Sequence, residues 1–387
     1  MKAPARPAPP RRRMLRLAGA LPLTLLLPPR VQAEPRPWPM WQRFVQRFVQ
    51  DDGRVVDHDT AEKHSTSEGQ SYAMFFALLA GDRALFERLW QWSLANLCPG
   101  GLARQLPAWR WGRRPDGSWG VLDANAAADA DMWFAYALLE AHRRWGEARH
   151  LADAELLLDH VERSEIANLP GFGAMVLPGP AGFTPDADTW RLNPSYLPLP
   201  LLRRFAQHRP SGPWAEIARN TPRLIGAAAP RGFAPDWIAY RRGSGFQRDP
   251  LHPDLGSYDA IRVYLWAGLT AAADPLARPL LRSLDGMRQA LRRDGVPPER
   301  VDVASGGVAG RAPAGFHAAV LPFLHACGET ALHARVLALL DPAQGPLREQ
   351  PAQPWPYYDQ MLALFGLGAT QGRYRFGADG RLQGLRR

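Results

Sequence analysis

Three short stretches of the chain each place a carboxylate at the start of an apolar segment of helical length. They are residues 66–74, 126–133 and 256–266, whose leading acids are Glu68, Asp129 and Asp259. The N-terminus of a helix carries a partial positive charge, which favours an ionised base and opposes a proton donor. For Glu68 to donate a proton near neutral pH, burial or a neighbouring carboxylate such as Asp129 or Asp131 must raise its pKa. Taken singly, each acid could equally serve only to stabilise the first turn of its helix.

Arg262 stands one helical turn after Asp259. At this spacing the guanidinium can hold the carboxylate ionised and oriented, as a base requires. An ordinary ion pair on a helix surface would have the same spacing, so the pattern leaves both interpretations open.

Aromatic residues are frequent in the Pro/Gly-rich loops between the expected helices, and several stand near Asp or Asn. A sugar chain requires this mixture, because each pyranose offers C–H faces to stack on and hydroxyls to bind. Aromatic residues are more often part of a core, so that alternative stays open at each position. The loop aromatics with these features are Trp109, Trp111, Trp119, Trp190, Trp237, Tyr196 and Tyr240.

Motifs of other chemistries are missing from the sequence. It contains no HExxH, P-loop, GxGxxG or GxSxG pattern, and its ten His show no spacing typical of metal ligands. The Asp-Ala-Asp triplets at 129–131 and 186–188 lack the further acids of a calcium loop. Cys98 and Cys327 cannot be paired from sequence, and two cysteines make no disulfide framework or thiolate metal site. We therefore expect no metal site and no cofactor.

The net charge of +10 would suggest a nucleic-acid partner, but most of the excess of basic residues lies in the N-terminal segment. Residues 1–33 hold seven of the 47 basic residues and none of the 37 acidic residues. The remaining chain therefore carries a net charge of about +3, which gives no support for a polyanionic partner.

Residues 1–33 resemble an export signal. A basic stretch at 11–16 precedes an apolar run at 17–27, and residues 31–33 (Val-Gln-Ala) form a small-residue cleavage site. The apolar run is too short to span a membrane. We expect cleavage after Ala33, a mature chain with no membrane span, and a periplasmic or secreted location. The arginine-rich start also resembles a twin-arginine signal, so the export route stays open, and an uncleaved anchor is the alternative.

From Trp38 onward, apolar stretches of helical length alternate with Pro/Gly-rich loops, and few segments show the two-residue period of a strand. The expected helices lie near 38–50, 68–80, 83–97, 129–145, 150–163, 195–207, 213–223, 258–273, 276–293, 314–327, 330–340 and 356–366. About a dozen helices in sequential pairs fit an all-α toroid of six inner and six outer helices, the (α/α)6 barrel. Short strands are expected near 171–177 and 374–376. No linker divides the chain, so residues 34–387 are expected to form a single domain.

At these residues the chain resembles glycoside hydrolase family 8. The similarity lies in 67–72 (Ser-Glu-Gly-Gln-Ser-Tyr), 256–262 (Gly-Ser-Tyr-Asp-Ala-Ile-Arg) and 129–131 (Asp-Ala-Asp), and it extends over the mature chain. Within the family it is greatest to the periplasmic endoglucanases encoded with bacterial cellulose synthase. The family usually has Ser or Thr where this chain has Ala128, so a hydroxyl that could cap the helix or bind Asp129 is absent.

The resemblance implies hydrolysis of β-1,4-glucan with inversion, in a long groove of an (α/α)6 barrel. By the same resemblance Glu68 is the general acid, Asp259 the base that activates water, Asp129 a ligand of the distorted sugar, and Tyr196 a ligand of the water. An inverting pair needs carboxyls roughly 6.5–9.5 Å apart, which leaves room for the water. The further residues expected to bind substrate are Trp119, Trp133, Trp190, Tyr258, Gln70 and Arg262. Cellulose is the expected partner, and the cellulose synthase export complex is a candidate second one.

Three alternatives stay open. A polysaccharide lyase on the same toroid would use a Tyr/His or Lys base and cationic subsites, which the near-neutral mature charge and the Glu68–Asp259 pair disfavour. A non-catalytic glucan-binding subunit of the export machinery would tolerate the loss of either carboxyl, and both are present. Xylanase or chitosanase activity within the same family is poorly separated by sequence.

Overall fold

The computed structural model describes residues 1–5, 37–350 and 354–383. By its internal contacts the chain divides into Met1–Glu34 and Pro35–Arg387, and every described helix and strand belongs to the second unit. The expected export signal lies outside the described residues, apart from its first five. Among the described residues, no helix is both long enough and apolar enough to cross a membrane.

Thirteen α-helices and one 3-10 helix make up the helical structure of the described residues. They are α1 Pro39–Phe48, α2 Ser67–Ala80, α3 Arg83–Leu97, α4 Ala128–Trp145, α5 Ala148–Ser164, η1 Pro194–Tyr196, α6 Leu199–His208, α7 Trp214–Ala228, α8 Ala260–Leu269, α9 Ala277–Ser283, α10 Asp285–Asp294, α11 Ala314–Ala326, α12 Thr330–Leu339 and α13 Tyr357–Thr370. The sequence predicted twelve helices, and the predicted helix 276–293 is divided at Leu284 into α9 and α10. The predicted helix 195–207 begins only at Leu199, because Pro198 disfavours helical backbone at Leu197.

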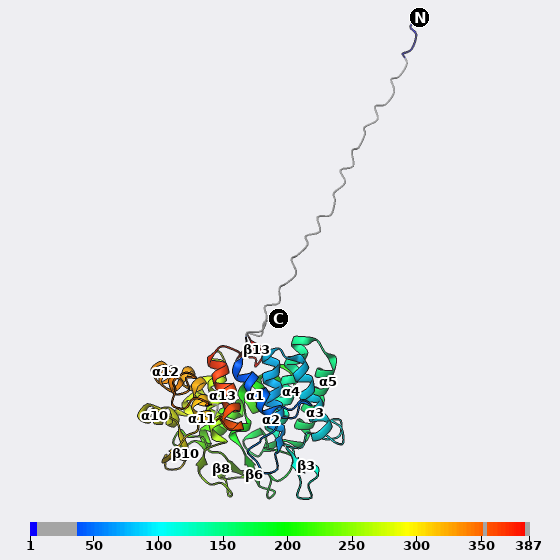
Figure 1. The fold of residues 1–387 in the computed structure, drawn as a ribbon. Helices are drawn as coiled ribbons and strands as arrows, with labels where there is room; N and C mark the ends of the chain where they lie inside the picture. Colours follow the sequence, from blue (N-terminus) through cyan, green and yellow to red (C-terminus); the bar gives the residue numbers. More distant parts are fainter. Residues whose placement is uncertain (6–36, 351–353, 384–387) are drawn as a thin grey trace. The chain divides into compact units, whose positions relative to one another are not determined.

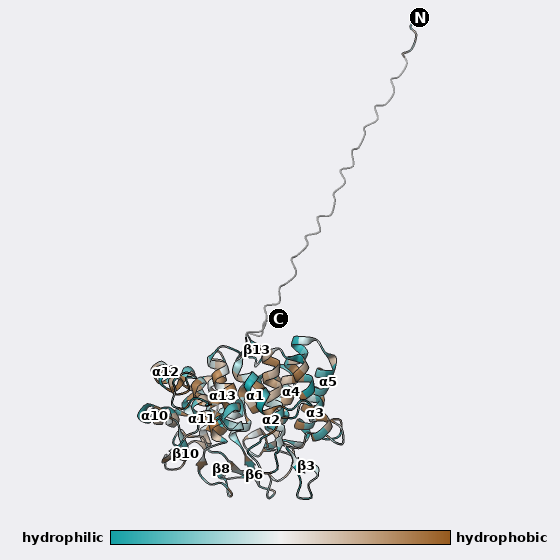
Figure 2. Ribbon diagram, in the orientation of Figure 1, coloured by the Kyte–Doolittle hydropathy of each residue, from teal (hydrophilic) through white to brown (hydrophobic). Residues whose placement is uncertain are grey.

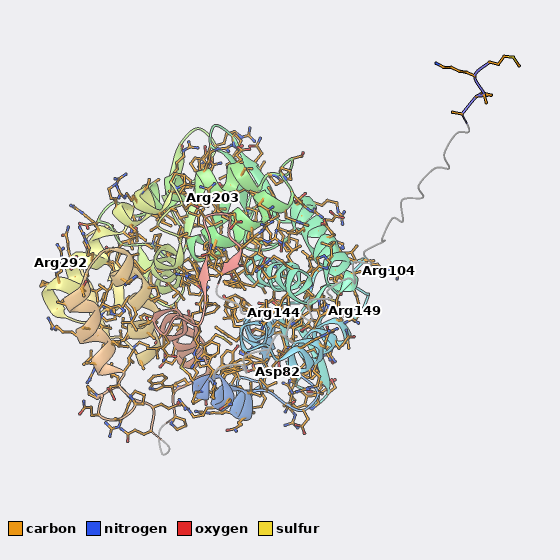
Figure 3. The ribbon with its side chains drawn as sticks, turned by 90° about the horizontal axis from the view of Figure 1, so that it is seen from above. Asp82, Arg104, Arg144, Arg149, Arg203 and Arg292 are labelled. Atoms are coloured by element: carbon orange, nitrogen blue, oxygen red, sulfur yellow. The ribbon has the colours of Figure 1, made fainter. Side chains whose placement is uncertain are left out.

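The helices form two concentric layers. The inner layer consists of α2, α4, α6, α8, α11 and α13, each of which packs against the next. This layer closes into a ring where Phe365 of α13 contacts Tyr72 and Phe76 of α2. The outer layer places α3 on α2, α5 on α4, α7 on α6, α9 on α8, α12 on α11 and α1 on α13. Figure 3 shows the ring from above, with Arg292 of α10 and Arg149 of α5 on opposite sides. The predicted (α/α)6 fold is therefore confirmed.

The two layers differ in how their side chains are buried. Inner helix α4 buries every residue from Ala128 to Ala141. Outer helix α1 buries only Trp41, Phe44 and Phe48, at the three- and four-residue spacing of a single apolar face. A helix that is apolar all round must lie inside, whereas one with a single apolar face lies outside. Figure 2 shows hydrophobic residues running through the helices and hydrophilic residues on outer helix α5.

Aromatic side chains fill the centre of the ring. The ring of Phe365 lies 5.2 Å from that of Tyr72 on α2, 5.3 Å from Trp133 on α4 and 5.1 Å from Trp266 on α8, measured between ring centres. Edge-to-face and tilted contacts of this kind each add about 0.5–1.5 kcal/mol beyond the burial of area. The helices that begin at the three acid-bearing stretches are therefore anchored in one shared core.

Small antiparallel sheets occupy the loops between the helices. Their strands are β1 Ser65–Thr66, β2 Arg110–Arg113, β3 Trp119–Asp123, β4 Ile166–Leu169, β5 Gly173–Val176, β6 Thr189–Leu192, β7 Ile238–Arg241, β8 Gly245–Arg248, β9 Leu255–Gly256, β10 Pro298–Asp302, β11 Val308–Arg311, β12 Arg375–Phe376 and β13 Leu382–Gln383. They pair in the orders β1-β2-β3, β4-β5, β6-β7-β8, β11-β10-β9 and β12-β13. Figure 1 shows β3, β6, β8 and β10 along one end of the helical unit. The strands predicted near 171–177 and 374–376 are confirmed as β5 and β12, and the others were not predicted.

The two cysteines end different helices. Cys98 is the C-terminal cap of α3 and Cys327 that of α11, and both are free thiols. Burial raises the pKa of Cys98 to about 12 and that of Cys327 to about 11. Both thiols therefore stay protonated near neutral pH and are poor nucleophiles.

Candidate active site

Glu68 lies in the first turn of α2. The Thr66 hydroxyl accepts a hydrogen bond from the Gly69 N–H at 3.1 Å and so caps the helix in place of the acid. Burial raises the pKa of Glu68 to about 7, and the negative charge of Asp129 contributes to the rise. The positive charge of Arg262 opposes the rise without cancelling it. A large fraction of Glu68 therefore keeps its proton near neutral pH.

Asp129 lies fully buried in the first turn of α4. Its Oδ2 accepts a hydrogen bond from the Tyr72 hydroxyl, which links the starts of α4 and α2. Its Oδ1 has no hydrogen-bond partner among the described protein groups. Burial raises the pKa of Asp129 to about 6, while Arg262 and Tyr72 act against the rise. No side chain caps α4: its cap position is Ala127, and Ala128 is the first helical residue.

A second pair of buried carboxyls lies near Asp129. Asp131 of α4 and Glu165 at the end of α5 are both fully buried. Their four carboxyl oxygens find no N–H or O–H donor elsewhere among the described residues, and the two groups interact with each other. Burial raises the pKa of each, which lets the pair share a proton. The charge of Asp129 contributes to the raised pKa of Glu68, and the charge of Glu68 in turn contributes to the raised pKa of Asp131.

Asp259 immediately precedes α8, and an arginine holds its carboxylate. Arg262 Nη2 donates a hydrogen bond to Asp259 Oδ1 at 2.8 Å and another to the Ser195 hydroxyl at 2.8 Å. Arg262 Nη1 donates to the Tyr358 hydroxyl at 3.2 Å. The Arg262 side chain is only 11% exposed, against 30% for Asp259. The pair is therefore not the surface ion pair that the spacing alone also allowed.

Asp236 lies beside the same helix start. Its Oδ1 accepts hydrogen bonds from the backbone N–H groups of Ser257, Asp259 and Ala260 at 2.8, 3.1 and 2.7 Å. Burial raises the pKa of Asp236 to about 6, and the charge of Asp259 adds to the rise. In the sequence, Asp236 was notable only as the neighbour of Trp237.

Tyr196 reaches the site from the short helix η1. Asn193 caps this turn, because its Oδ1 accepts hydrogen bonds from the Ser195 N–H at 3.0 Å and the Ser195 hydroxyl at 2.7 Å. Trp266 Nε1 donates to the Ser195 carbonyl at 2.8 Å and so fastens the turn to α8. The position of Tyr196 is thus tied to the helix that Asp259 precedes.

Five of the predicted site residues come together here. Burial raises the pKa of Tyr196 well above its usual value, and the charges of Glu68, Asp259 and Asp129 add to the rise. The guanidinium of Arg262 lies 5.8 Å from the centre of the Tyr196 ring. The three helix starts are therefore close in space, although Glu68 and Asp259 are 191 positions apart in the chain.

Gln70 does not belong to this group. It is buried, and its Oε1 accepts a hydrogen bond from the Val55 N–H at 2.5 Å. Its Nε2 donates to the Gly53 carbonyl at 3.2 Å and the Ser93 hydroxyl at 3.1 Å. These bonds occupy the amide and fasten the loop at 53–55 to α2 and α3. The expectation that Gln70 binds substrate is corrected accordingly.

Trp133 is also unsuited to contact a substrate. Its side chain is fully buried among the central aromatic residues, with its ring 5.7 Å from that of Tyr72 and 5.4 Å from that of Trp266. It supports Asp129, one helical turn earlier on α4, from inside the core. The expectation that Trp133 binds substrate is therefore corrected to a structural role.

Trp119, Trp190 and Tyr258 lie on elements next to the carboxylates. Trp119 of β3 is 47% exposed and stacks on Trp111 at 5.5 Å, in the sheet whose strand β1 leads directly into α2. Trp190 is half-buried on β6, the strand that leads into η1. Tyr258 is 48% exposed and directly precedes Asp259. All three offer accessible aromatic surface on elements that are paired with, or lead into, the elements of the acids.

Several residues that hold the site together were missed from the sequence. They are Tyr72, Ser195, Asp236 and Tyr358. Each binds a partner far away in the chain, as Tyr72 binds Asp129 across 57 positions and Tyr358 binds Arg262 across 96. No local pattern marks such pairs, because only the folded ring brings them together.

Residues 22–372 match the model of one protein family, glycosyl hydrolases family 8. The chain belongs to glycosyl hydrolase family 8. The resemblance seen in the motifs around Glu68, Asp129 and Asp259 is thereby confirmed at the level of the family.

Two relatives are similar to this chain over nearly their whole length. An endoglucanase of Pseudomonas fluorescens (strain SBW25) is 47% identical over 367 residues, which cover 91% of this chain and 92% of the relative. An endoglucanase of Xanthomonas axonopodis pv. citri (strain 306) is 47% identical over 379 residues, or 96% of each chain. The crystal structure of an endo-1,4-D-glucanase from Vibrio fischeri ES114 has a TM-score of 0.80 at 38% identity, covering 90% of this chain and 99% of that one.

Proposed function

We propose that this family 8 glycosyl hydrolase is an endo-1,4-β-glucanase that cleaves β-1,4-glucan with inversion. The endoglucanase names of relatives that are 47% identical over more than nine-tenths of both chains support the substrate and the internal cleavage. The arrangement of Glu68 and Asp259 supports the mechanism. No metal is needed for it, because two carboxyls move both protons.

One observation carries the assignment of roles: the two acids have opposite surroundings. Glu68 lies half-buried near the carboxyl of Asp129, and its pKa rises to about 7. Asp259 accepts a hydrogen bond from the buried guanidinium of Arg262 at 2.8 Å. Titratable groups whose environments differ in this way divide the roles of acid and base between them.

In the proposed reaction, Glu68 donates its proton to the glycosidic oxygen as the bond from that oxygen to the anomeric carbon breaks. Asp259 accepts a proton from a water molecule whose oxygen bonds to the anomeric carbon from the opposite face. The product therefore has inverted configuration. Glu68 ends ionised and Asp259 protonated, and exchange with solvent restores both.

Asp129 and Tyr196 are proposed to hold the sugar and the water. The family resemblance assigns Asp129 to the sugar, and its Oδ1 makes no hydrogen bond of normal geometry with a described residue, although Trp133 interacts with the same carboxyl from the core. The Tyr196 hydroxyl lies within electrostatic reach of both Glu68 and Asp259. The attacking water must stand between those two acids, which makes Tyr196 a suitable ligand for it.

Trp119, Trp190 and Tyr258 are proposed to bind sugar units away from the cleaved bond. Their exposed or half-buried rings can stack on the C–H faces of pyranoses. They lie on three separate elements, β3, β6 and the segment directly before α8, so together they can contact more than one sugar unit. Cleavage inside a polymer requires such an extended binding surface.

The cellular setting is proposed from the N-terminal segment and the family resemblance. Residues 1–33 would be removed on export, and residues 34–387 would act as one catalytic domain in the periplasm or outside the cell. There the enzyme would trim cellulose during synthesis, next to the synthase export complex. Mass spectrometry of the exported protein should give a chain that starts at Glu34, and a chain that still starts at Met1 would contradict the proposed cleavage.

The function is tested by the release of reducing ends from carboxymethylcellulose. Glu68→Gln and Asp259→Asn keep the shape of each side chain but remove its proton chemistry, so each should lower kcat by roughly 10²–10⁴-fold. Glu147→Gln, in an exposed ion pair with Arg83, is the matched control and should retain full activity.

Two outcomes would contradict the proposal. Folded wild-type protein that binds glucan but releases no ends would favour the non-catalytic subunit. Activity that survives Asp259→Asn would show that another residue is the base.

A further inference from the structure

Asp259 stands where an aspartate ordinarily caps its own helix. It is the residue directly before α8, and an Asp at this position usually accepts a hydrogen bond from an N–H group of the first turn. Asp259 makes no such bond. Its backbone is already helical, with φ −80° and ψ −49°, and its Oδ1 accepts from Arg262 instead. A carboxylate that capped the helix would be turned toward the backbone and away from the guanidinium.

Asp236 accepts the hydrogen bonds of a helix cap in place of Asp259. A single oxygen, Asp236 Oδ1, accepts from the N–H groups of Ser257, Asp259 and Ala260 at 2.8, 3.1 and 2.7 Å. The backbone N–H groups at the start of α8, which have no partner within the helix, therefore donate to a residue 23 positions before Asp259 in the chain.

We propose that Asp236 is the positioning residue of the base: by capping α8 it frees the Asp259 carboxylate for Arg262 and the attacking water. This inference rests on the proposed function, because it concerns the delivery of the base of that reaction. Asp236 itself acts only through the backbone of residues 257–260.

The segment that carries Asp236 makes further contacts with α8 and with strand β9, which precedes it. The Ala234 N–H donates to the Tyr264 hydroxyl, on the second turn of α8, at 2.9 Å. The Asp236 N–H donates to the Leu255 carbonyl at 2.7 Å. Gly256 has no side chain at the point where the Ala234 carbonyl approaches it, and a Cβ there would collide with that oxygen. These contacts leave Asp236 little freedom relative to the backbone of Asp259.

The interaction depends on an oxygen acceptor rather than on a negative charge. All three donors reach the same Oδ1, and an asparagine at this position retains that oxygen. The charge itself is unfavourable, because Asp236 is buried and the nearby charge of Asp259 repels it. A change to asparagine should therefore preserve the geometry, whereas a change to alanine removes the acceptor and leaves three N–H groups unpaired.

The test compares Asp236→Ala with Asp236→Asn in the mature enzyme, on a soluble cello-oligosaccharide. Displacement of the base by about 1 Å is enough to lower the rate ~100-fold. Asp236→Ala should therefore lower kcat by about that factor with little change in KM, because substrate binding does not use Asp259 as a ligand. Asp236→Asn should recover most of kcat.

The matched control is Asp82→Ala. Asp82 caps α3 by accepting from the Leu85 N–H at 2.9 Å. It follows the C-terminus of α2, and since α2 has 14 residues it lies about 20 Å from Glu68. The loss of this cap should lower Tm in the same direction as Asp236→Ala while leaving kcat at the wild-type value.

The outcomes separate this inference from the proposed function. An inactive wild type would overturn the function, whereas an active wild type with normal kcat in folded Asp236→Ala would overturn only the positioning role. Equal losses in Asp236→Ala and Asp236→Asn would also overturn it, because only the asparagine keeps the acceptor. A loss confined to KM would assign Asp236 to substrate binding instead.

Discussion

Glu68 and Asp259 both stand at the start of an inner helix, but their neighbours differ. Thr66 caps α2, and the Glu68 side chain lies half-buried near Asp129. At α8 the cap comes from Asp236, and the Asp259 carboxylate faces a guanidinium. Since the helix dipole favours the ionised acid at both positions, burial and like charge must outweigh it for Glu68. The neighbours, rather than the two helix starts, separate the acid from the base.

The charge of Asp129 should be visible in the pH profile. Because Glu68 must carry a proton to act, kcat/KM should fall as the pH rises through about 7, where its pKa lies. Asp129→Asn removes a negative charge near Glu68, which lowers the pKa of Glu68 and moves the falling limb to lower pH. The measurement is kcat/KM against pH for both enzymes.

Asp294→Asn is the control for this shift. Asp294 pairs with Arg293 at the exposed end of α10, so its removal should leave the limb in place. If the falling limb of the pH profile does not shift in Asp129→Asn, the charge of Asp129 does not raise the pKa of Glu68.

At the level of single residues, the sequence is informative where the interacting residues are close together in the chain. An acid at a helix start and an arginine one turn later are both visible in a short window, so Glu68, Asp129, Asp259 and Arg262 could be found. Gln70 and Trp133 were misassigned because a motif does not show which face of a helix its residues occupy. Asp236 was missed because its partners lie 21 to 24 positions away, across a loop.

The inner helices hold the acids in fixed positions relative to one another. Their existence and approximate bounds follow from long apolar runs, which is why most of them could be predicted. Apart from β5 and β12, the strands of the small sheets were not predicted, because several have only two residues and pair across distant segments, as Ser65 pairs with Trp111. These sheets nevertheless carry Trp119 and lead into Glu68, so the unpredicted elements border the site.

Close packing of α13 against α11 is a testable feature of the ring. A Cβ on Gly366 would collide with the backbone carbonyl of Ala318, which cannot move aside as a side chain could. Gly366→Ala should therefore destabilise the fold by about 1–3 kcal/mol, as overpacking does. Urea unfolding followed by circular dichroism would measure the change.

Gly226→Ala provides the comparison for that experiment. Gly226 lies in outer helix α7, and a Cβ there would meet only the Ser283 hydroxyl at 3.2 Å. Alanine is the better helix former by up to about 1 kcal/mol, so this variant should be as stable as the wild type or more so. Equal destabilisation of the two variants would show that the α11–α13 contact is not specifically tight.

For the whole molecule, closure of the ring is what brings the distant acids together. Glu68 and Asp259 lie 191 positions apart, at the starts of helices α2 and α8, which are separated within the inner layer by α4 and α6. Only the closed ring, filled by Phe365, Trp133 and Trp266, brings both acids to Tyr196. The count and pairing of helices predicted this closure, whereas the contacts at its centre depend on packing that no local pattern encodes.

The most direct test of the central claim is the anomeric configuration of the first product. Proton NMR should be recorded on a cello-oligosaccharide digest early enough that mutarotation has not mixed the anomers. If Glu68 and Asp259 act as acid and base on opposite faces of the sugar, the α-anomer should appear first and the β-anomer should grow in only later. If the β-anomer appears first, the reaction retains configuration, and Asp259 cannot be the base of a single inverting displacement.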